Sequence, residues 1–187
     1  EMCIRDSCTC FLEITDKPDS RTDYRQSYAK AYQEEFSKPR DVNRLYGEQN
    51  LFRYLPLKNM ILRLFPKDTD EEATMIAHAA RICRTPLTIS FGPTDDRSSR
   101  LAGLGCTLRK ESLEDFLKEL PEYERVRTCS PDIPDVMYER AAETNKYIAT
   151  APPVKQGRIE LIHYIKEQSI AFEYHRYGSI SEVPPCE

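Results

Sequence analysis

Cys106 and Cys129 are two residues of this sequence whose side chains could act as nucleophiles. Cys106 follows a short glycine-containing loop, Gly103-Leu104-Gly105, and Cys129 ends a predicted strand just ahead of a predicted helix, whose dipole would favour a thiolate. A reactive thiol needs a base or another group that stabilises its thiolate, and the sequence shows no such partner beside either cysteine. We therefore favour buried structural thiols, with a small complete enzyme as the lesser alternative.

Other sequence patterns that could bind a cofactor or a metal ion are incomplete. The loop at residues 103–105 lacks the third glycine of a dinucleotide fingerprint and is more typical of a turn. His78, His163 and His175 do not have the spacing of a zinc site, and Cys8 and Cys10 form no repeated cysteine pair. The sequence therefore predicts no catalytic, cofactor-binding or metal-ligating residue in this chain.

A polar and aromatic cluster near the C-terminus, His175-Arg176-Tyr177-Gly178, is the candidate interface or covering site. A cation flanked by aromatic rings could bind a carboxylate or close over a neighbouring site. Alternatively, the cluster is the polar end of an edge strand that turns at Gly178.

Composition favours a single domain with an appendage. The chain has 187 residues, a net charge of −4, 40% hydrophobic residues and 31% charged residues, with both signs interspersed. There is no basic stripe for nucleic acid, no apolar run long enough for a transmembrane segment, and no signal-peptide pattern. Seven irregularly spaced cysteines make a poor disulfide framework. We expect a cytoplasmic protein with reduced cysteines.

The chain divides into four predicted segments. Residues 1–19 are a poorly defined lead-in that begins with EMCIRDS, which resembles translated adapter sequence and would make the chain truncated. Residues 20–46 form a helix and linker from a preceding module, residues 47–156 an α/β domain, and residues 157–187 a C-terminal helix and strand arm with a tail.

An aromatic stripe predicts the first helix, since Tyr24, Tyr28, Tyr32 and Phe36 recur every four residues. We interpret this stripe as a buried face, and its own segment offers little to bury it against. The stripe would then need a surface supplied by another module.

Alternating strand and helix patterns predict the α/β domain. A capping box at Asp68 and Glu71 begins a helix whose buried face carries residues such as Ala73 and Ile76. Residues 94–110 give no clear pattern. Steps of this length favour a mainly parallel sheet flanked by helices. The predicted elements are strands at residues 10–14, 60–65, 87–91, 125–129 and 147–150, and helices beginning near residues 69, 112 and 134.

The stretch at residues 157–178 combines two periodicities. Ile159, Ile162 and Ile165 have helical spacing, whereas from Ser169 onward apolar residues alternate with polar ones, as in a half-buried strand. We expect a helix followed by a strand at an edge of the sheet or on a partner.

Two motifs stand near the ends of the chain, GEQNLFRYLP at residues 47–56 and RIELIHYIKEQSIAFEYHRYGSI at residues 158–180. The first is similar to the GE-x-N-x-x-RY-x-P sequence of the proline utilization A family, and the second is similar to that family's C-terminal motif. Members of this family are bifunctional proline dehydrogenases and L-glutamate γ-semialdehyde dehydrogenases. Residues 27–45 are similar to the helix and linker that precede the first motif in the family. The resemblance extends over about residues 20–180.

This resemblance implies a Rossmann-like tail domain with an aldehyde-dehydrogenase fold that has lost its active site. It implies a parent protein that oxidises L-glutamate γ-semialdehyde with NAD, after flavin (FAD)-dependent oxidation of proline. The family's catalytic cysteine motif and glutamate base have no counterpart here, so the fragment is expected to be inactive alone. Its implied partner is the catalytic aldehyde dehydrogenase module of the same parent chain, which it would cover.

A different class of function fits the same α/β pattern. A free-standing binding or regulatory module would use the loops at the strand ends for a small ligand. Such a module would be monodisperse and would fold cooperatively, whereas a fragment that covers a partner would expose apolar surface.

Overall fold

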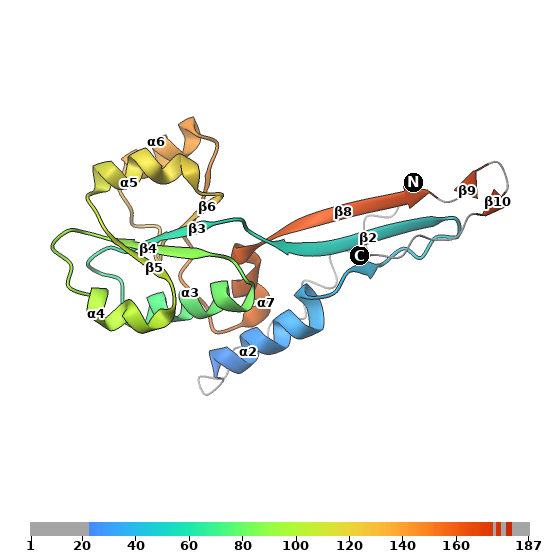
Figure 1. Ribbon diagram of the computed structural model, residues 1–187, viewed down its shortest axis with the longest axis horizontal. Coiled ribbons are helices and arrows are strands. Elements are labelled where there is room, and N and C mark those ends of the chain that lie inside the picture. Colours follow the sequence, from blue (N-terminus) through green and yellow to red (C-terminus); the bar gives the residue numbers. More distant parts are fainter. Residues whose placement is uncertain (1–22, 174, 177–178, 181–187) are drawn as a thin grey trace.

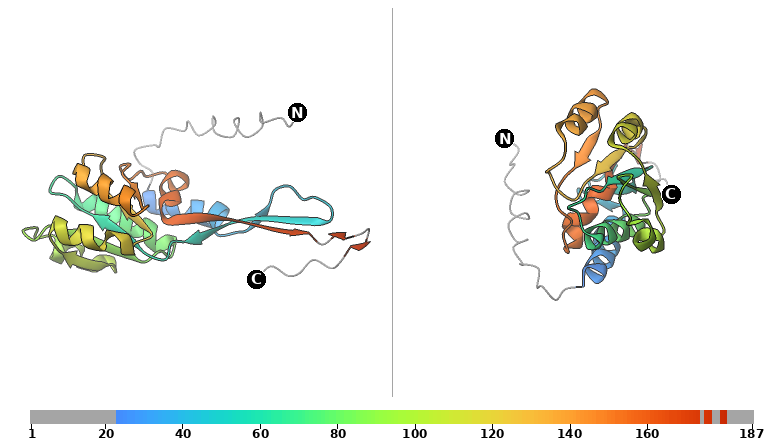
Figure 2. Two further views of the ribbon diagram at one scale, coloured as in Figure 1. Left: turned by 90° about the horizontal axis from the view of Figure 1, so that it is seen from above. Right: turned by 90° about the vertical axis from the view of Figure 1, so that its left-hand side faces the viewer.

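The computed structural model describes residues 23–173, 175–176 and 179–180. These residues form an α/β domain and a long antiparallel ribbon that extends away from it (Figures 1 and 2). The predicted strand at residues 10–14 and the lead-in at residues 1–19 lie outside the described residues. Among the described residues, no helix is long and apolar enough to cross a membrane.

The α/β domain is built on a five-stranded parallel sheet in the order β5-β4-β3-β6-β7. Along the chain, the central strand β3 comes first, β4 and β5 follow on one side of it, and β6 and β7 then follow on the other side. This winding confirms the predicted mainly parallel α/β fold. The strands are β3 (Met60–Arg63), β4 (Leu87–Phe91), β5 (Thr107–Lys110), β6 (Arg125–Arg127) and β7 (Tyr147–Ala149).

Helices cover both faces of this sheet (Figure 1). Alternate residues of β3 divide between the faces: Met60 and Leu62 belong to one buried cluster, and Ile61 belongs to the other. The elements on the first face are α3 (Asp70–Ile82), α4 (Ser98–Leu101) and η2 (Ala102–Leu104), and those on the second are α5 (Leu113–Glu119), η3 (Leu120–Glu122) and α6 (Asp135–Glu143).

The N-cap of α3 lies one residue later in the chain than predicted. Thr69 is the N-cap, and its side chain and that of Glu72 accept each other's backbone N–H in a capping box. The predicted pair, Asp68 and Glu71, is therefore wrong by one position. The predicted apolar face is confirmed, since Ala73 and Ile76 are fully buried.

Residues 94–110 contain a strand that the pattern did not reveal. β5 pairs in parallel with β4 and occupies an edge of the sheet. Its sequence, Thr107-Leu108-Arg109-Lys110, is exposed or half-buried throughout. An edge strand needs one covered side only, so it lacks the apolar run that marks the inner strands.

The ribbon joins two segments that are far apart in the sequence. β2 (Glu48–Pro56) and β8 (Ile165–Glu173) pair antiparallel from Glu48 opposite Glu173 to Pro56 opposite Ile165. β1 (Arg40–Asp41) adds to the outer side of β2. β8 is thus an edge strand, as expected, but of this second sheet. Residues 48–56 lie in the ribbon, at the start of the segment predicted as the α/β domain.

The helix before β8 is shorter than predicted. α7 (Gly157–Glu160) continues as the 3-10 turn η4 (Leu161–Tyr164), and the strand begins at Ile165 instead of Ser169. Ile159 and Ile162 are exposed, at 41% and 48%, so the predicted isoleucine face is wrong. Gly157, Glu160, Leu161 and Tyr164 form the buried side instead.

The aromatic stripe is buried as predicted, but against this chain itself. α2 (Tyr24–Ala31) and the π-helical turn η1 (Tyr32–Phe36) pack beside α3 and α7, with Tyr28 fully buried and Phe36 4% exposed. The ring of Tyr28 stacks on that of His78, with centroids 6.2 Å apart. The prediction that this helix needs a surface supplied by another module is therefore wrong.

Candidate functional site

Neither candidate cysteine has the environment of a nucleophile. Cys129 is 2% exposed, and burial and then the carboxylates of Asp68 and Glu72 raise the pKa of its thiol. Burial also raises the pKa of the half-buried Cys106. The raised pKa values disfavour a thiolate at either residue, and the alternative of a small enzyme based on these residues stays a prediction.

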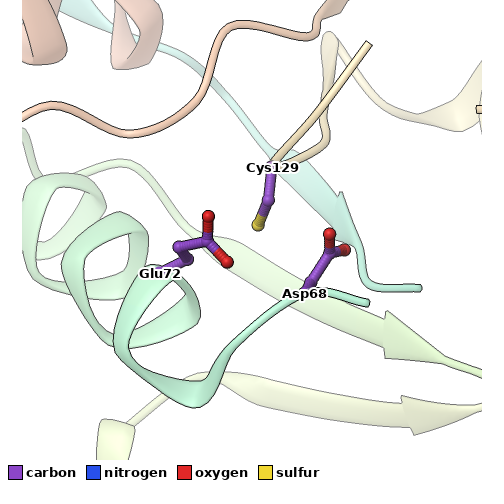
Figure 3. Close-up of side chains that lie close together, drawn as sticks. All are labelled: Asp68, Glu72 and Cys129. Atoms are coloured by element: carbon purple, nitrogen blue, oxygen red, sulfur yellow. The ribbon is translucent and has the colours of Figure 1, made fainter. Parts of the chain in front are cut away.

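Asp68, Glu72 and Cys129 come together near the start of α3 (Figure 3), with one ligand atom of each within 4.8 Å of the others. These residue types could bind a divalent cation. One oxygen of each carboxylate already accepts hydrogen bonds: Asp68 Oδ2 accepts the N–H of Phe65 at 2.7 Å, and Glu72 Oε2 accepts the N–H and the hydroxyl of Thr69, both at 2.8 Å. The cluster fixes the loop between β3 and α3. The sequence concealed it, because Cys129 lies about sixty positions away.

The histidines do not converge on one site. His78 packs between α2 and α3, where burial, followed by Arg81 and Arg25, lowers its pKa. His163 lies in η4, and burial, followed by Arg127, lowers its pKa to about 4. His175 and Arg176 form β9 (His175–Arg176), which pairs with β10 (Ser179–Ile180). Tyr177 and Gly178 lie outside the described residues, so the predicted covering site stays a prediction.

A buried ion pair connects the α/β domain to the root of the ribbon. Arg127 and Glu160 have fully buried side chains, and Arg127 Nη2 donates to Glu160 Oε1 at 3.0 Å. Tyr164 OH donates to the same oxygen at 2.6 Å, and the N–H of Val154 donates to Oε2 at 2.9 Å. The carbonyl oxygen of Val154 in turn accepts a hydrogen bond from the hydroxyl of Tyr28 at 2.6 Å. This network links β6, α7, η4 and α2.

The close approach of α2 and α7 depends on a glycine. A Cβ atom at Gly157 would lie 2.4 Å from the carbonyl oxygen of Ser27 and 2.9 Å from Cβ of Ala31. The N–H of Gly157 donates to Ser27 Oγ at 2.9 Å. The glycine therefore fixes how α2 lies against the root of the ribbon.

The far part of the ribbon exposes large apolar side chains. Tyr46 is 83% exposed and Val42 77%, while Leu45 and Phe172 are about half exposed, at 50% and 46%. Val42, Leu45 and Phe52 line a groove of about 510 Å³ along the ribbon. Apolar side chains grouped on one projecting element mark an interaction surface. This surface, Val42, Leu45, Tyr46 and Phe172, is called the arm surface below.

In three dimensions the chain resembles proline utilization A. It aligns with proline utilization A from Corynebacterium freiburgense at a TM-score of 0.60 and 25% identity, over 86% of this chain and 14% of that protein. The chain thus spans about a seventh of the length of that relative. The predicted resemblance is confirmed at the level of structure, over nearly the whole described chain.

Two other dehydrogenases share the fold at lower identity. An NAD⁺ complex of an aldehyde dehydrogenase from Bacillus cereus aligns at a TM-score of 0.54 and 11% identity, over 67% of this chain and 28% of that one. A histidinol dehydrogenase from Elizabethkingia anophelis aligns at a TM-score of 0.53 and 10% identity, over 70% of this chain and 34% of that one. No protein-family model and no curated protein sequence matches the chain. The chain therefore has a dehydrogenase-type fold, and these two likenesses carry no information on its substrate.

Proposed function

We propose that this chain is the non-catalytic C-terminal part of a proline-catabolic L-glutamate γ-semialdehyde dehydrogenase, and that its ribbon docks on the catalytic module of the same parent protein. The exposed arm surface carries this proposal, because its apolar side chains lie on a ribbon outside the two buried clusters of the domain. Figure 1 shows that this ribbon extends away from the domain. The two end motifs and the likeness to proline utilization A support the choice of parent. The parent would use NAD for the aldehyde step and FAD for proline oxidation.

The local chemistry favours an inactive Rossmann-type unit that binds no dinucleotide. In dinucleotide-binding domains a glycine-rich turn leads from the first strand into a helix N-terminus, which receives the pyrophosphate. Here residues 64–69 (LFPKDT) contain no glycine, and Asp68, Asp70 and Glu72 place carboxylates at the start of α3. These negative charges would repel a pyrophosphate, so we expect NAD to bind on the catalytic module instead.

A test requires the parent protein, whose gene is obtained by reading the genomic DNA upstream of the codon for Cys8, since residues 1–7 resemble adapter sequence. An open reading frame that continues into an aldehyde dehydrogenase module is expected, and a stop codon directly upstream would refute the parentage. The 187-residue chain alone is expected to give no turnover with L-glutamate γ-semialdehyde and NAD. Robust turnover by the chain alone would contradict the non-catalytic assignment.

The docking role is tested in the parent by adding charge to the arm surface. Tyr46→Lys and Phe172→Lys are expected to weaken association of the two modules, measured by limited proteolysis and by the rate of semialdehyde oxidation. Val136→Lys is the matched control, since Val136 is 40% exposed on α6, on the α/β domain and away from the ribbon. Equal behaviour of all three variants would refute docking through the arm surface.

A further inference from the structure

A cleft of about 410 Å³ opens beside the carboxyl ends of β3 and β4, away from the ribbon. The loop at residues 64–70 forms one wall, with Leu64, Phe65 and Pro66, and the loop at residues 92–100 forms the other. Clefts at this edge of a parallel sheet are where α/β proteins bind small ligands. A volume of this size accommodates a small metabolite.

Arg63, the last residue of β3, lines this cleft and is 5% exposed. Its Nη1 donates to Ser90 Oγ at 2.7 Å and to the carbonyl oxygen of Glu111 at 3.3 Å, and its guanidinium lies 5.3 Å from the centre of the Phe116 ring. Nε is buried without a hydrogen-bond partner, and Nη2 donates to no residue that the structure describes.

The unused donors of Arg63 form one edge of its guanidinium. Nε is enclosed, so Nη2 is the donor of this edge that a carboxylate in the cleft would contact. Arg63 has no carboxylate within ion-pair distance among the described residues; Glu111 is connected to it through the hydroxyl of Ser90, which donates to Glu111 Oε1 at 2.5 Å. A bound carboxylate would accept a charge-assisted hydrogen bond from Nη2.

The other charges of the cleft favour a ligand that also carries a positive group. Asp95 pairs with Arg97 at 2.9 Å, and Asp70 and Asp96 both pair with Arg100, at 2.6 and 3.2 Å. Asp68 is the lining carboxylate that forms no ion pair with a described residue, and its hydrogen bond from Phe65 uses Oδ2 alone. The cleft therefore offers one buried cation and one half-buried anion.

We propose that this cleft binds a free α-amino acid, whose carboxylate pairs with Arg63 and whose ammonium group faces Asp68. The apolar wall of Leu64, Phe65 and Pro66 would receive an aliphatic side chain. Four aspartates around the cleft disfavour phosphate, which carries more negative charge than a carboxylate and no positive group. The site is independent of the arm surface, so each proposal can fail without the other.

The first experiment titrates the 187-residue chain with L-leucine and follows backbone amide shifts by NMR. Shifts are expected at Phe65, Asp68 and Gly92, with saturation. Leucine methyl ester, which lacks the carboxylate, and N-acetyl-leucine, which lacks the ammonium group, are each expected to bind at least about tenfold more weakly, the size of one lost charge-assisted hydrogen bond. Absence of leucine binding, equal binding of the ester, or preferential binding of inorganic phosphate would each overturn the proposal.

Variants identify the two groups that recognise the ligand. Arg63→Met is expected to lower leucine affinity at least about tenfold, whereas Arg25→Met, at an exposed arginine of α2, is expected to leave it unchanged. If Arg63→Met does not fold by circular dichroism, Asp68→Asn decides, since asparagine can still accept the N–H of Phe65. Asp68→Asn is expected to remove the preference for leucine over N-acetyl-leucine. Retention of that preference, or unchanged affinity in a folded Arg63→Met, would refute the assignment.

Discussion

Replacing Glu160 by glutamine tests whether the buried network at the root of the ribbon stabilises the fold. The carboxylate accepts Arg127 Nη2 and Tyr164 OH on Oε1 and the N–H of Val154 on Oε2. A glutamine side chain keeps one acceptor oxygen, and its NH₂ group must then face at least one of these three donors. Arg127, which is fully buried, would also lose its counter-ion.

The expected loss of stability is large for a single isosteric change. Breaking one side of a buried ion pair costs about 3–5 kcal/mol, because the remaining charge stays buried and unpaired. A domain of this size has a free energy of unfolding of about 5–15 kcal/mol in total. At about 2–4 °C per kcal/mol, Glu160→Gln should lower Tm by roughly 6–20 °C.

Urea unfolding, followed by far-UV circular dichroism, measures this effect. Asp132→Asn is the matched control, because its salt bridge with Lys67 is exposed, at 72% and 84%, and should leave the urea midpoint nearly unchanged. The double variant with Arg127→Met and Glu160→Gln should lose at least about 1 kcal/mol less free energy of unfolding than the two single variants lose together. A loss below about 1 kcal/mol for Glu160→Gln, or strict additivity in the double variant, would refute the reasoning.

Three further predictions concern the same part of the structure and the cluster near α3. Gly157→Ala should destabilise the fold by about 1–3 kcal/mol in urea unfolding, because the new methyl group would lie 2.4 Å from the carbonyl oxygen of Ser27; wild-type stability would show that α2 moves aside freely. His163 has a pKa lowered to about 4 from an ordinary value of 6.5, so the unfolded state binds more protons between these values. The stabilisation from neutral His163 is complete above about pH 6.5 and is lost as the pH falls toward about 4, so Tm should drop over this range. His163→Gln should make Tm depend less steeply on pH. Parallel curves of Tm against pH for the two proteins would contradict an origin in His163. One equivalent of Zn²⁺ should leave Tm unchanged, since the carboxylates near Cys129 already accept hydrogen bonds; an increase that Cys129→Ser abolishes would reveal a metal site.

Local patterns predicted the elements of the α/β domain but not the contacts between distant residues. The strand at Leu87–Phe91 and the apolar face of α3 follow directly from hydrophobic periodicity, which depends only on neighbours along the chain. The pairing of β2 with β8 connects segments more than a hundred residues apart, and nothing within either segment specifies its partner. The same limit concealed the ion pair of Arg127 with Glu160.

Misreading the segment before β8 had a specific physical cause. Three isoleucines at helical spacing suggested an apolar face, but Ile159 lies in the single α-helical turn of α7, Ile162 in the 3-10 turn η4 and Ile165 in β8. They therefore share no continuous helical face, and of the three only Ile165 is buried. The buried side then includes Glu160, a residue type that is rarely buried without a partner. A lone glutamate in an apolar run gives no sign in the sequence that an arginine on a distant strand will pair with it.

One group of buried polar residues lies where the ribbon leaves the domain. Tyr164 accepts the N–H of Leu57 and the hydroxyl of Thr85 on its carbonyl oxygen, while its own hydroxyl donates to Glu160. Leu57 directly follows β2 and Ile165 begins β8, so both strands of the ribbon are connected at one point to β6 and to Thr85, which follows α3. Apolar side chains could fill this space with equal or greater stability, but they would not define one orientation as directional hydrogen bonds do. If the ribbon docks on a partner as proposed above, it needs one fixed orientation, which the buried ion pair of Arg127 and Glu160 would supply.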